Sequence, residues 1–273
     1  MLGLGKAAIG GGVNTVASKV DIVIRAKNGH ALTADCILSI KSNTPPGSYR
    51  IILVDDGSDP IYPQMGQDYT VRSDVSSGAV TATNLGLQIA LALDGDSVVI
   101  FDNDTRVPDG DTTWLERWVT ALNEQPDTAC VGATTNYANP PQHILACPQT
   151  YTADWQDDKA GKWGVKDGPA VVWFISCAVL FRKDVIRRLG LWDERFNPGN
   201  WEDTDYAMRV RDAGYAIRVA QSVYIHHEGH KTFSDDLQRL LVVNGQKFRA
   251  KWGLGKLYDM GIVQKAELMK HAR

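Results

Sequence analysis

The sequence contains few cysteines and no arrangement of them that would bind zinc. There are four among 273 residues, and none belongs to a C-x-x-C pair. Each stands beside apolar residues, so we expect buried free thiols, which are typical of a protein in a reducing compartment. The four are Cys36, Cys130, Cys147 and Cys177.

Long hydrophobic runs are absent as well. No apolar run approaches the roughly 18 residues that are needed to span a bilayer, so we expect no membrane span. Residues 1–19 are rich in glycine and alanine, carry Lys6 and Asn14, and have no compact apolar stretch. We predict a loosely ordered N-terminal arm there, not a signal peptide, and therefore a cytoplasmic protein.

The chain also lacks an excess of positive charge. Its net charge is -3, from 29 basic and 32 acidic residues, so nothing indicates a protein that wraps nucleic acid. No H-E-x-x-H motif is present, which argues against a zinc hydrolase. With 273 residues and 44% apolar composition, the chain is long enough for a substantial core and has an ordinary size for one α/β domain.

Through the first hundred residues, short apolar runs alternate with segments in which apolar residues recur at helical spacing. Segments of this length between the runs imply parallel strands in a sheet that helices cover. Polar residues follow the expected strands, and ligands of such sheets bind beyond the carboxyl ends of the strands. We predict strands at 20–24, 51–54, 69–72 and 97–101, and helices at 31–40 and 79–93.

The pattern changes after Asp104. Residues 137–170 are polar and contain proline and aromatic residues, so we expect a loop-rich acceptor region there. In the rest of the chain we predict helices at 114–122, 184–189, 202–213 and 235–252, and strands at 129–133 and 171–181.

The most specific local feature is a D-x-D motif directly after an expected strand. Asp102 and Asp104 lie two residues apart, so both carboxylates can share one divalent cation, and hard oxygen ligands suit Mg²⁺ or Mn²⁺. A turn in which aspartates bond the backbone is the simpler interpretation of so short a motif. The position at a strand end only partly favours the metal site.

Asp55 and Asp56 end the strand at 51–54 in the same way. A carboxylate there can accept hydrogen bonds from a base N–H or from ribose hydroxyls. Turn formation by Asp-Asp-Gly-Ser explains the residues equally well.

A third acidic group, Glu202-Asp203-x-Asp205, opens a later helix. Helix capping is enough to explain these residues. Asn200 would be the N-cap, the acidic residues would interact favourably with the positive end of the helix dipole, and Asp205 would pair with Arg209. A carboxylate at a helix start that faces a cleft is also a suitable general base.

Half of the six histidines lie within five positions. They can supply a metal ligand or a phosphate contact. Of His226, His227 and His230, we choose His227 as the metal ligand and keep the other two as alternatives.

Taken together, these segments resemble the family 2 glycosyltransferases over residues 20–233. The sequence Ile-Ile-Leu-Val-Asp-Asp-Gly-Ser at 51–58 is similar to the family's second strand. Phe101 to Asp104 is similar to its metal motif, and residues 202–215 to the block that carries the catalytic base. Arg25-Ala26-Lys27-Asn28 stands at the family's first loop, with Arg25 and Lys27 in place of the usual proline and tyrosine. Further similar segments are Gly78-x-x-x-Ala82-x-Asn84-x-Gly86, 174–177 and 189–196.

The resemblance implies one GT-A domain, an α/β fold with a mostly parallel twisted sheet flanked by helices. The nucleotide-sugar half would comprise residues 20–105 and the acceptor half residues 106–233, followed by a helical tail at 234–273. The implied reaction is metal-dependent transfer of a sugar from a nucleotide-diphospho-sugar to an acceptor hydroxyl, with inversion. UDP is the expected nucleotide, with dTDP or GDP as alternatives, and Mn²⁺ or Mg²⁺ is the expected cofactor.

The resemblance also assigns roles to individual residues. Asp203 would be the general base, and Glu202 or Asp205 would orient the acceptor. Asp102, Asp104 and His227 would hold the metal. The expected donor contacts are Ala26, Asn28, Asp55, Asp56, Arg72, Asn84, Asp102 and Asn103.

Two other functions are compatible with this order of elements. A sugar-phosphate nucleotidyltransferase would need a glycine-rich basic phosphate loop after the first strand, and residues 25–29 are not such a loop. A non-catalytic nucleotide-sugar or carbohydrate-binding module would not need both a metal site and a base. Retaining transfer on the same fold also stays open, and so does the class of acceptor.

Overall fold

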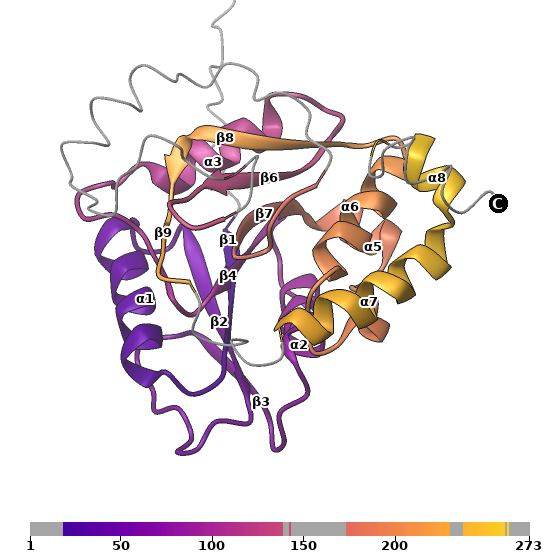
Figure 1. Cartoon of the computed structure of the whole chain (residues 1–273). Helices are drawn as coiled ribbons and strands as arrows, with labels where there is room; N and C mark the ends of the chain where they lie inside the picture. The colour runs from indigo at the N-terminus through magenta and orange to yellow at the C-terminus, as the bar shows by residue number, and fades with distance from the viewer. Residues whose placement is uncertain (1–18, 139–141, 143–172, 230–236, 260, 262–273) are drawn as a thin grey trace, which may run out of the picture.

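A seven-stranded sheet with helices on both faces forms the protein in the computed structural model (Figure 1). The structure describes residues 19–138, 142, 173–229, 237–259 and 261. The expected N-terminal arm, most of the loop-rich stretch at 137–170, and His230 therefore lie outside the described residues. No helix in the described part has the length and apolar character to cross a bilayer.

The N-terminal half alternates strand and helix, as the periodicity predicts. Strands β3, β2, β1 and β4 are neighbours in that order and run parallel. Their carboxyl ends therefore share one edge of the sheet, which is where Asp56 and Asp102 lie. The elements are β1 (Val20–Ala26), α1 (His30–Asn43), β2 (Tyr49–Asp56), β3 (Tyr69–Ser73), α2 (Ala79–Ala92) and β4 (Ser97–Asp102).

The second half extends the same sheet in the order β7, β6, β8. Strand β7 is antiparallel to both β4 and β6, and β8 is parallel to β6. The predicted strand at 171–181 is too long, because β7 begins only at Ala178 in the described residues. The sequence analysis did not predict strand β8. The elements are α3 (Trp114–Asn123), β6 (Thr128–Thr134), β7 (Ala178–Arg182), α5 (Lys183–Leu189), the 3₁₀ helix η1 (Glu194–Phe196), α6 (Glu202–Asp212), β8 (Ala216–Tyr224), α7 (Leu237–Trp252) and α8 (Leu254–Asp259).

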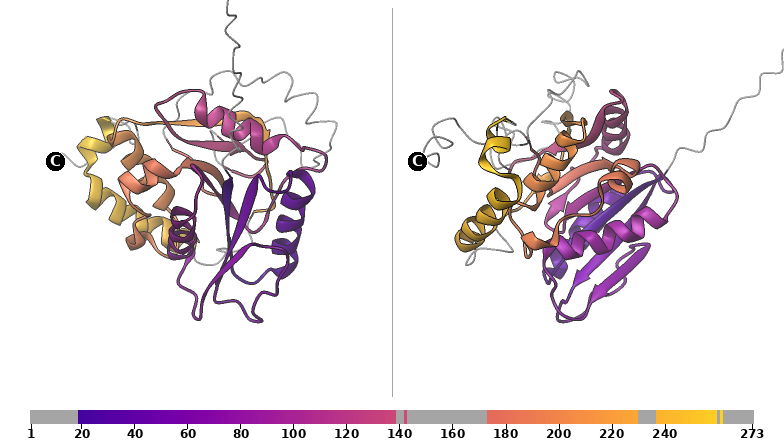
Figure 2. Two further views of the ribbon diagram at one scale, coloured as in Figure 1. Left: turned by 180° about the vertical axis from the view of Figure 1, so that it is seen from behind. Right: turned by 90° about the vertical axis from the view of Figure 1, so that its right-hand side faces the viewer.

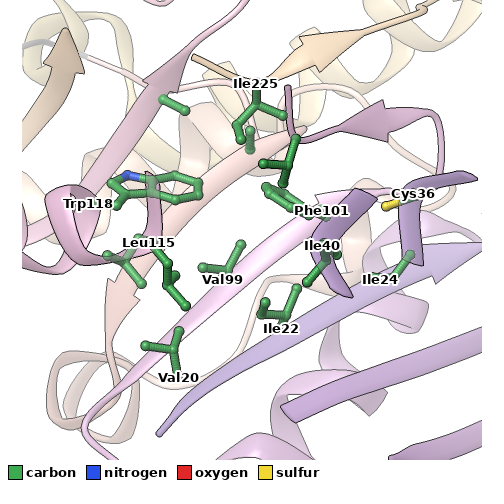
Figure 3. Close-up of a cluster of buried hydrophobic side chains, with 14 of the residues drawn as sticks. Val20, Ile22, Ile24, Cys36, Ile40, Val99, Phe101, Leu115, Trp118 and Ile225 are labelled. Atoms are coloured by element: carbon green, nitrogen blue, oxygen red, sulfur yellow. The ribbon is translucent and has the colours of Figure 1, made fainter. Parts of the chain in front are cut away.

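Alternation along the strands divides the core between the two faces of the sheet. Ile22, Ile24 and Phe101 pack with α1 and α3 on one face (Figure 3), while Val23 and Ile100 pack with α2 and the C-terminal helices on the other. The views in Figure 2 show α1 and the group α2, α5, α6 and α7 on opposite sides of the sheet. Full burial of each such side chain contributes about 1.5–3 kcal/mol. The side chains of Arg25 and Asp102, one residue beyond Ile24 and Phe101, therefore face α2 and α6.

A short antiparallel ribbon closes the carboxyl edge of the sheet. Strand β5 (Thr105–Arg106) pairs with β9 (His226–His227), with Thr105 opposite His227. The Glu228 amide also donates to the Asp104 carbonyl at 3.0 Å. This pairing brings the histidine segment to the D-x-D motif from more than a hundred residues away.

Candidate active site

Three of the predicted metal ligands lie together at the carboxyl end of β4. Asp102, Asp104 and His227 each offer a ligand atom, and these atoms lie within 4.8 Å of one another. His227 Nε2 is 3.3 Å from Asp104 Oδ1 and 3.9 Å from Asp102 Oδ2. Two carboxylates and one imidazole can together ligate one metal ion, so these residues fit a divalent cation.

The orientation of the His227 ring is determined by residues 136 and 137. His227 Nδ1 donates to the Tyr137 carbonyl oxygen over 2.8 Å, which leaves Nε2 directed at the carboxylates. Asn136 holds the backbone of His227, since its Oδ1 accepts from the amide at 2.8 Å and its Nδ2 donates to the carbonyl at 3.0 Å. Metal-bound histidines commonly have such a carbonyl partner on the second nitrogen.

The electrostatics of this group favour positive charge. Burial lowers the pKa of His227, but the hydrogen bond to Asp104 and the nearby Cys177 and Asp102 raise it to about 12. Burial raises the pKa of Asp104, and the interaction with His227 outweighs it, so that this pKa is lowered. The carboxylates thus stabilise a cation between them.

The neighbouring His226 does not belong to this group. Its Nε2 contacts Glu228 Oε1 at 3.2 Å, and burial lowers its pKa. Of the three candidate histidines, the described part of the chain brings only His227 to the carboxylates.

Arg25 is a site residue whose role the sequence did not reveal. Its Nε donates to Asp102 Oδ1 at 2.5 Å, its Nη1 to Thr83 Oγ1 at 3.0 Å and its Nη2 to Ser176 Oγ at 3.0 Å. Arg25 lies directly opposite Asp102 in the β1–β4 register. A basic residue and an acidic residue at the ends of two adjacent predicted strands were the signal that could have indicated this pair.

The start of helix α6, where Glu202 interacts electrostatically with Arg25, has no conventional cap. Trp201 occupies the N-cap position with φ 74°, and no side chain caps the helix. The capping interpretation based on Asn200 is therefore wrong. Asp203 Oδ1 accepts from the amide of its own neighbour Thr204 at 2.7 Å.

Glu202 and Asp203 both hold protons more tightly than ordinary carboxyls. Burial and the charge of Asp203 raise the pKa of Glu202 to about 8, with Arg25 acting in the opposite direction. Burial also raises the pKa of Asp203, against the Thr204 amide and Arg25. Among the described residues, Glu202 Oε2 is buried with no hydrogen-bond partner. Carboxyls with pKa values shifted towards neutrality are typical of acid–base sites.

Asp205 has different surroundings from its two neighbours. It is fully buried, its carboxylate accepts from Lys251 Nζ at 2.8 Å and from Trp252 Nε1 at 2.8 Å, and it pairs with Arg209 at 3.3 Å. These contacts attach α7 to α6 and take up both oxygens. The catalytic hypothesis below therefore rests on Glu202 and Asp203.

The aspartates at the end of β2 hold the loops around the expected donor pocket. Asp55 accepts from the Ser58 amide at 2.9 Å and forms an ion pair with Arg72, which lies opposite it on β3. Asp56 accepts from the Ser77 amide at 2.6 Å and from Ser76 Oγ at 2.8 Å, just before α2. Direct contacts of Asp55, Asp56 and Arg72 with a donor stay a prediction.

The buried Ala26 ends β1, and the exposed Asn28 lies in the loop that follows. The Asn28 amide donates to Ser58 Oγ at 2.8 Å, and Asn28 Oδ1 accepts from the Asp59 amide at 3.1 Å. Asn28 thereby joins the ends of β1 and β2. Its contact with a donor, like that of Ala26, stays a prediction.

An aromatic pair that the sequence analysis missed lies next to this loop. The rings of His30 and Tyr62 stack with centroids 4.2 Å apart. Thr33 Oγ1 lies 2.9 Å from the Tyr62 hydroxyl and accepts from Asn103 Nδ2 at 2.9 Å. Asn103 is thus directed towards α1, and its contact with a donor stays a prediction.

Asn84 is the remaining predicted donor contact, and its polar atoms are engaged elsewhere. Its Nδ2 donates to the Trp192 carbonyl at 2.9 Å and to Glu194 Oε1 at 3.0 Å, and its Oδ1 accepts from the Trp192 amide at 2.9 Å. These bonds pack α2 against the segment before α6, and its donor contact stays a prediction.

Comparison with known proteins identifies the family. Residues 21–190 match the family described as Glycosyl transferase family 2. The chain belongs to glycosyl transferase family 2. The resemblance to that family is thereby confirmed. The matched range includes the strand that carries Asp55 and Asp56 and the D-x-D motif, and it ends before the block at 202–215.

Two curated relatives of this family 2 chain come from Pasteurella multocida. A chondroitin synthase (strain Pm70) is 24% identical over an alignment of 232 residues, which covers 72% of this chain and 23% of that protein. A hyaluronan synthase is 22% identical over the same shares of both chains. The chain thus spans about a quarter of the length of these relatives.

Solved structures confirm the predicted GT-A fold. The mannosyltransferase PcManGT from Pyrobaculum calidifontis, in complex with GDP-Man and Mn²⁺, superposes with a TM-score of 0.61 at 17% identity, covering 86% of this chain and 65% of that chain. GalNAc-T7, solved with UDP, GalNAc and Mn²⁺, gives 0.62 at 14% identity, covering 94% and 54%.

Proposed function

We propose that this family 2 domain transfers a sugar from a nucleotide-diphospho-sugar to an acceptor hydroxyl, with inversion and with a divalent cation. One observation carries the proposal: Arg25 interacts electrostatically both with the cation site (Asp102, Asp104, His227) and with a pair of carboxyls that have raised pKa values (Glu202, Asp203). The proposal keeps residues 20–105 as the donor half and 106–233 as the acceptor half.

Asp102, Asp104 and His227 would hold the cation, Mn²⁺ or Mg²⁺. A cation bound there would act as a Lewis acid that neutralises charge on the departing diphosphate. Complexes of similar folds with Mn²⁺ support this assignment. The three ligands come from β4, the turn after it and β9, so the cation would lie at the carboxyl edge of the sheet.

Asp203 would accept the proton of the acceptor hydroxyl. The acceptor oxygen then forms its bond to the anomeric carbon as the bond to the diphosphate oxygen breaks, and the electron pair leaves with the diphosphate. Burial raises the pKa of Asp203 and so makes it a stronger base than an ordinary aspartate. Glu202, with a pKa of about 8, is protonated at neutral pH and would donate a hydrogen bond that orients the acceptor.

The proposed donor carries UDP, with dTDP and GDP as the alternatives. GalNAc-T7 was solved with UDP and PcManGT with GDP-Man, so both nucleotides occur on similar folds. The Asn28–Ser58 and Asp55–Arg72 contacts border the proposed base and ribose pocket. We further propose a cytoplasmic location, which the buried free thiols of Cys36, Cys130 and Cys177 support.

The test is a donor screen on the whole chain. Thermal stabilisation and donor hydrolysis are measured with UDP-, dTDP-, GDP- and CMP-sugars in the presence of Mn²⁺ and again in excess EDTA. A ligand that binds only the folded state raises the melting temperature, so one nucleotide should stand out, and EDTA should abolish the effect. Equal hydrolysis in EDTA would contradict the cation's role. Donor binding without turnover of any acceptor would favour the non-catalytic module.

A further inference from the structure

Arg25 is a largely buried cation that interacts with both acidic groups of the site. Its side chain is 10% exposed, and its Nε contacts Asp102 Oδ1. Its positive charge also acts to lower the pKa of Glu202. The parallel register places Arg25 directly opposite Asp102, so both side chains point to the face that α6 covers.

Two hydroxyls hold the guanidinium in this position. Thr83 Oγ1 accepts from Nη1 at 3.0 Å and is itself fixed by donating to the Ala79 carbonyl at 2.8 Å. Ser176 Oγ accepts from Nη2 at 3.0 Å. Asp102 Oδ1 is therefore occupied by Arg25, and Oδ2 is the oxygen that faces His227 at 3.9 Å.

The formal charges show the consequence for cation binding. A bound divalent cation, the two aspartates, Arg25 and a neutral His227 would together carry one excess positive charge. An uncompensated charge in a buried site is costly. The negative charges of a diphosphate offset that excess. Without Arg25, the cation alone would balance the two aspartates.

We infer that Arg25 couples the two ligands of the site: it weakens cation binding to the free protein and makes a nucleoside diphosphate strengthen it. The inference rests on the proposed nucleotide-diphosphate donor. Coupling between two sites is reciprocal, so the cation must strengthen diphosphate binding by the same factor. Typical couplings are about 5- to 150-fold, and we expect the wild-type factor in the upper part of that range.

The test is a calorimetric titration of Mn²⁺ into the whole chain, with and without saturating UDP, for wild type, Arg25→Gln, Arg25→Met and Arg25→Lys. Glutamine retains a hydrogen bond to Asp102 but has no charge. We expect Arg25→Gln and Arg25→Met to bind Mn²⁺ alone more tightly than wild type. We expect the factor by which UDP strengthens Mn²⁺ binding to fall at least fivefold in both. Arg25→Lys keeps the charge and should keep most of the coupling.

Inorganic pyrophosphate serves as a second probe, because Arg25 acts on the diphosphate and not on the base. The factor by which pyrophosphate strengthens Mn²⁺ binding should rank the variants in the same order as the factor for UDP. A coupling factor in Arg25→Gln within twofold of wild type would overturn the inference, and so would an equal loss in Arg25→Lys, which would implicate geometry instead of charge. Failure of wild type to bind any nucleoside diphosphate would instead contradict the proposed function, while pyrophosphate would still test Arg25. If Arg25→Met does not fold, Arg25→Gln carries the test.

Discussion

At the scale of single residues, the site consists of carboxylates whose partners differ. Asp104 has His227 as its partner, Asp102 has Arg25, and Asp205 has Lys251. A motif of aspartates in the sequence does not distinguish these cases, because the carboxylates differ in which basic side chain the fold brings to each of them. Substitutions of single carboxylates should therefore have different consequences for cation binding, turnover and stability.

Asp104→Ala should abolish stabilisation of the protein by Mn²⁺ and lower turnover at least about 10²-fold, because loss of a cation ligand removes several kcal/mol of transition-state stabilisation. Thermal melts with and without Mn²⁺, together with initial rates, measure both effects. The matched control is Asp127→Asn, since Asp127 is 55% exposed and pairs only with Arg218 among the contacts described. Mn²⁺ stabilisation of Asp104→Ala equal to wild type would remove Asp104 from the cation site.

Asp203→Asn should lower kcat by roughly 10²- to 10⁴-fold, with donor and Mn²⁺ affinity near wild type. Asparagine keeps the size of the side chain but cannot accept the proton. Because Asp203 bonds only the adjacent Thr204 amide and hydroxyl among the hydrogen bonds described, the melting temperature should change little. Kinetics and donor titration on this variant decide the point. Turnover within tenfold of wild type would exclude Asp203 as the base, and a product of retained configuration would exclude direct displacement.

Glu202→Gln should behave differently from Asp203→Asn. The raised pKa of about 8 means that folding favours the protonated form of Glu202, so its contribution to stability is full below its ordinary pKa of 4.5 and is lost as pH rises through about 8. Glutamine resembles the protonated acid at every pH. The variant should therefore gain stability relative to wild type between pH 5 and about pH 8.5, as urea denaturation would measure. A stability difference that is constant over this range would contradict the raised pKa.

At the scale of elements, close packing of α2 determines where several site residues lie. Helix α2 carries Thr83, which fixes Arg25, and follows the loop that Asp56 holds. Gly86 allows the helix to approach the sheet, since a Cβ atom there would lie 2.3 Å from Val23 Cγ1 and 2.9 Å from Val54 Cγ2. The motif glycine is therefore a packing residue.

Gly86→Ala should destabilise the protein by about 1–3 kcal/mol, because overpacking of the α2–sheet contact exceeds the gain in helix propensity of about 1 kcal/mol. Chemical denaturation measures the change. Gly255→Ala is the matched control, since Gly255 lies in helix α8 with no atom within 4 Å of an added Cβ, and it should be neutral or slightly stabilising. Equal effects at the two positions would contradict the close contact.

At the scale of the whole molecule, the edge of the sheet at the carboxyl ends of the parallel strands and the edge at their amino ends have different roles. The carboxyl edge holds the site. Beyond the amino ends of β1 and β4, Lys183 is fully buried and donates to Asp21, which also accepts from Arg50 Nε at 2.6 Å. This network joins the two halves of the sheet through α5, far along the strands from the cation group.

Lys183→Met should lower the free energy of unfolding by about 3 kcal/mol, because Asp21 would lose one of its two buried cationic partners. Retention of Arg50 places the effect at the low end of the 3–5 kcal/mol that such losses usually cost. Mn²⁺ affinity should stay within about twofold of wild type, since the network is remote from Asp104. A large loss of Mn²⁺ affinity without loss of stability would contradict this separation.

Local patterns in the sequence determined most of the N-terminal half of the fold and the identity of the family. Runs such as those of β1, β2 and β4 are continuous and buried, and the polar residues that follow β4 include Asp102 and Asp104, which the structure brings together with His227. These signals depend only on residues near one another in the chain, so periodicity reveals them. The predicted elements differ from the observed ones mainly in their end residues.

Only the tertiary structure decided the features that depend on long-range pairing. Strand β8 was missed because Arg218 and Gln221 interrupt its apolar residues, and β5 and β9 are too short to show a period. The sequence also did not show which basic residue contacts each aspartate. Arg25 contacts Asp102 from 77 residues away, and Lys251 contacts Asp205 from 46 residues away. Neighbours so far apart in the chain are set by strand register and helix packing, which a local pattern does not encode.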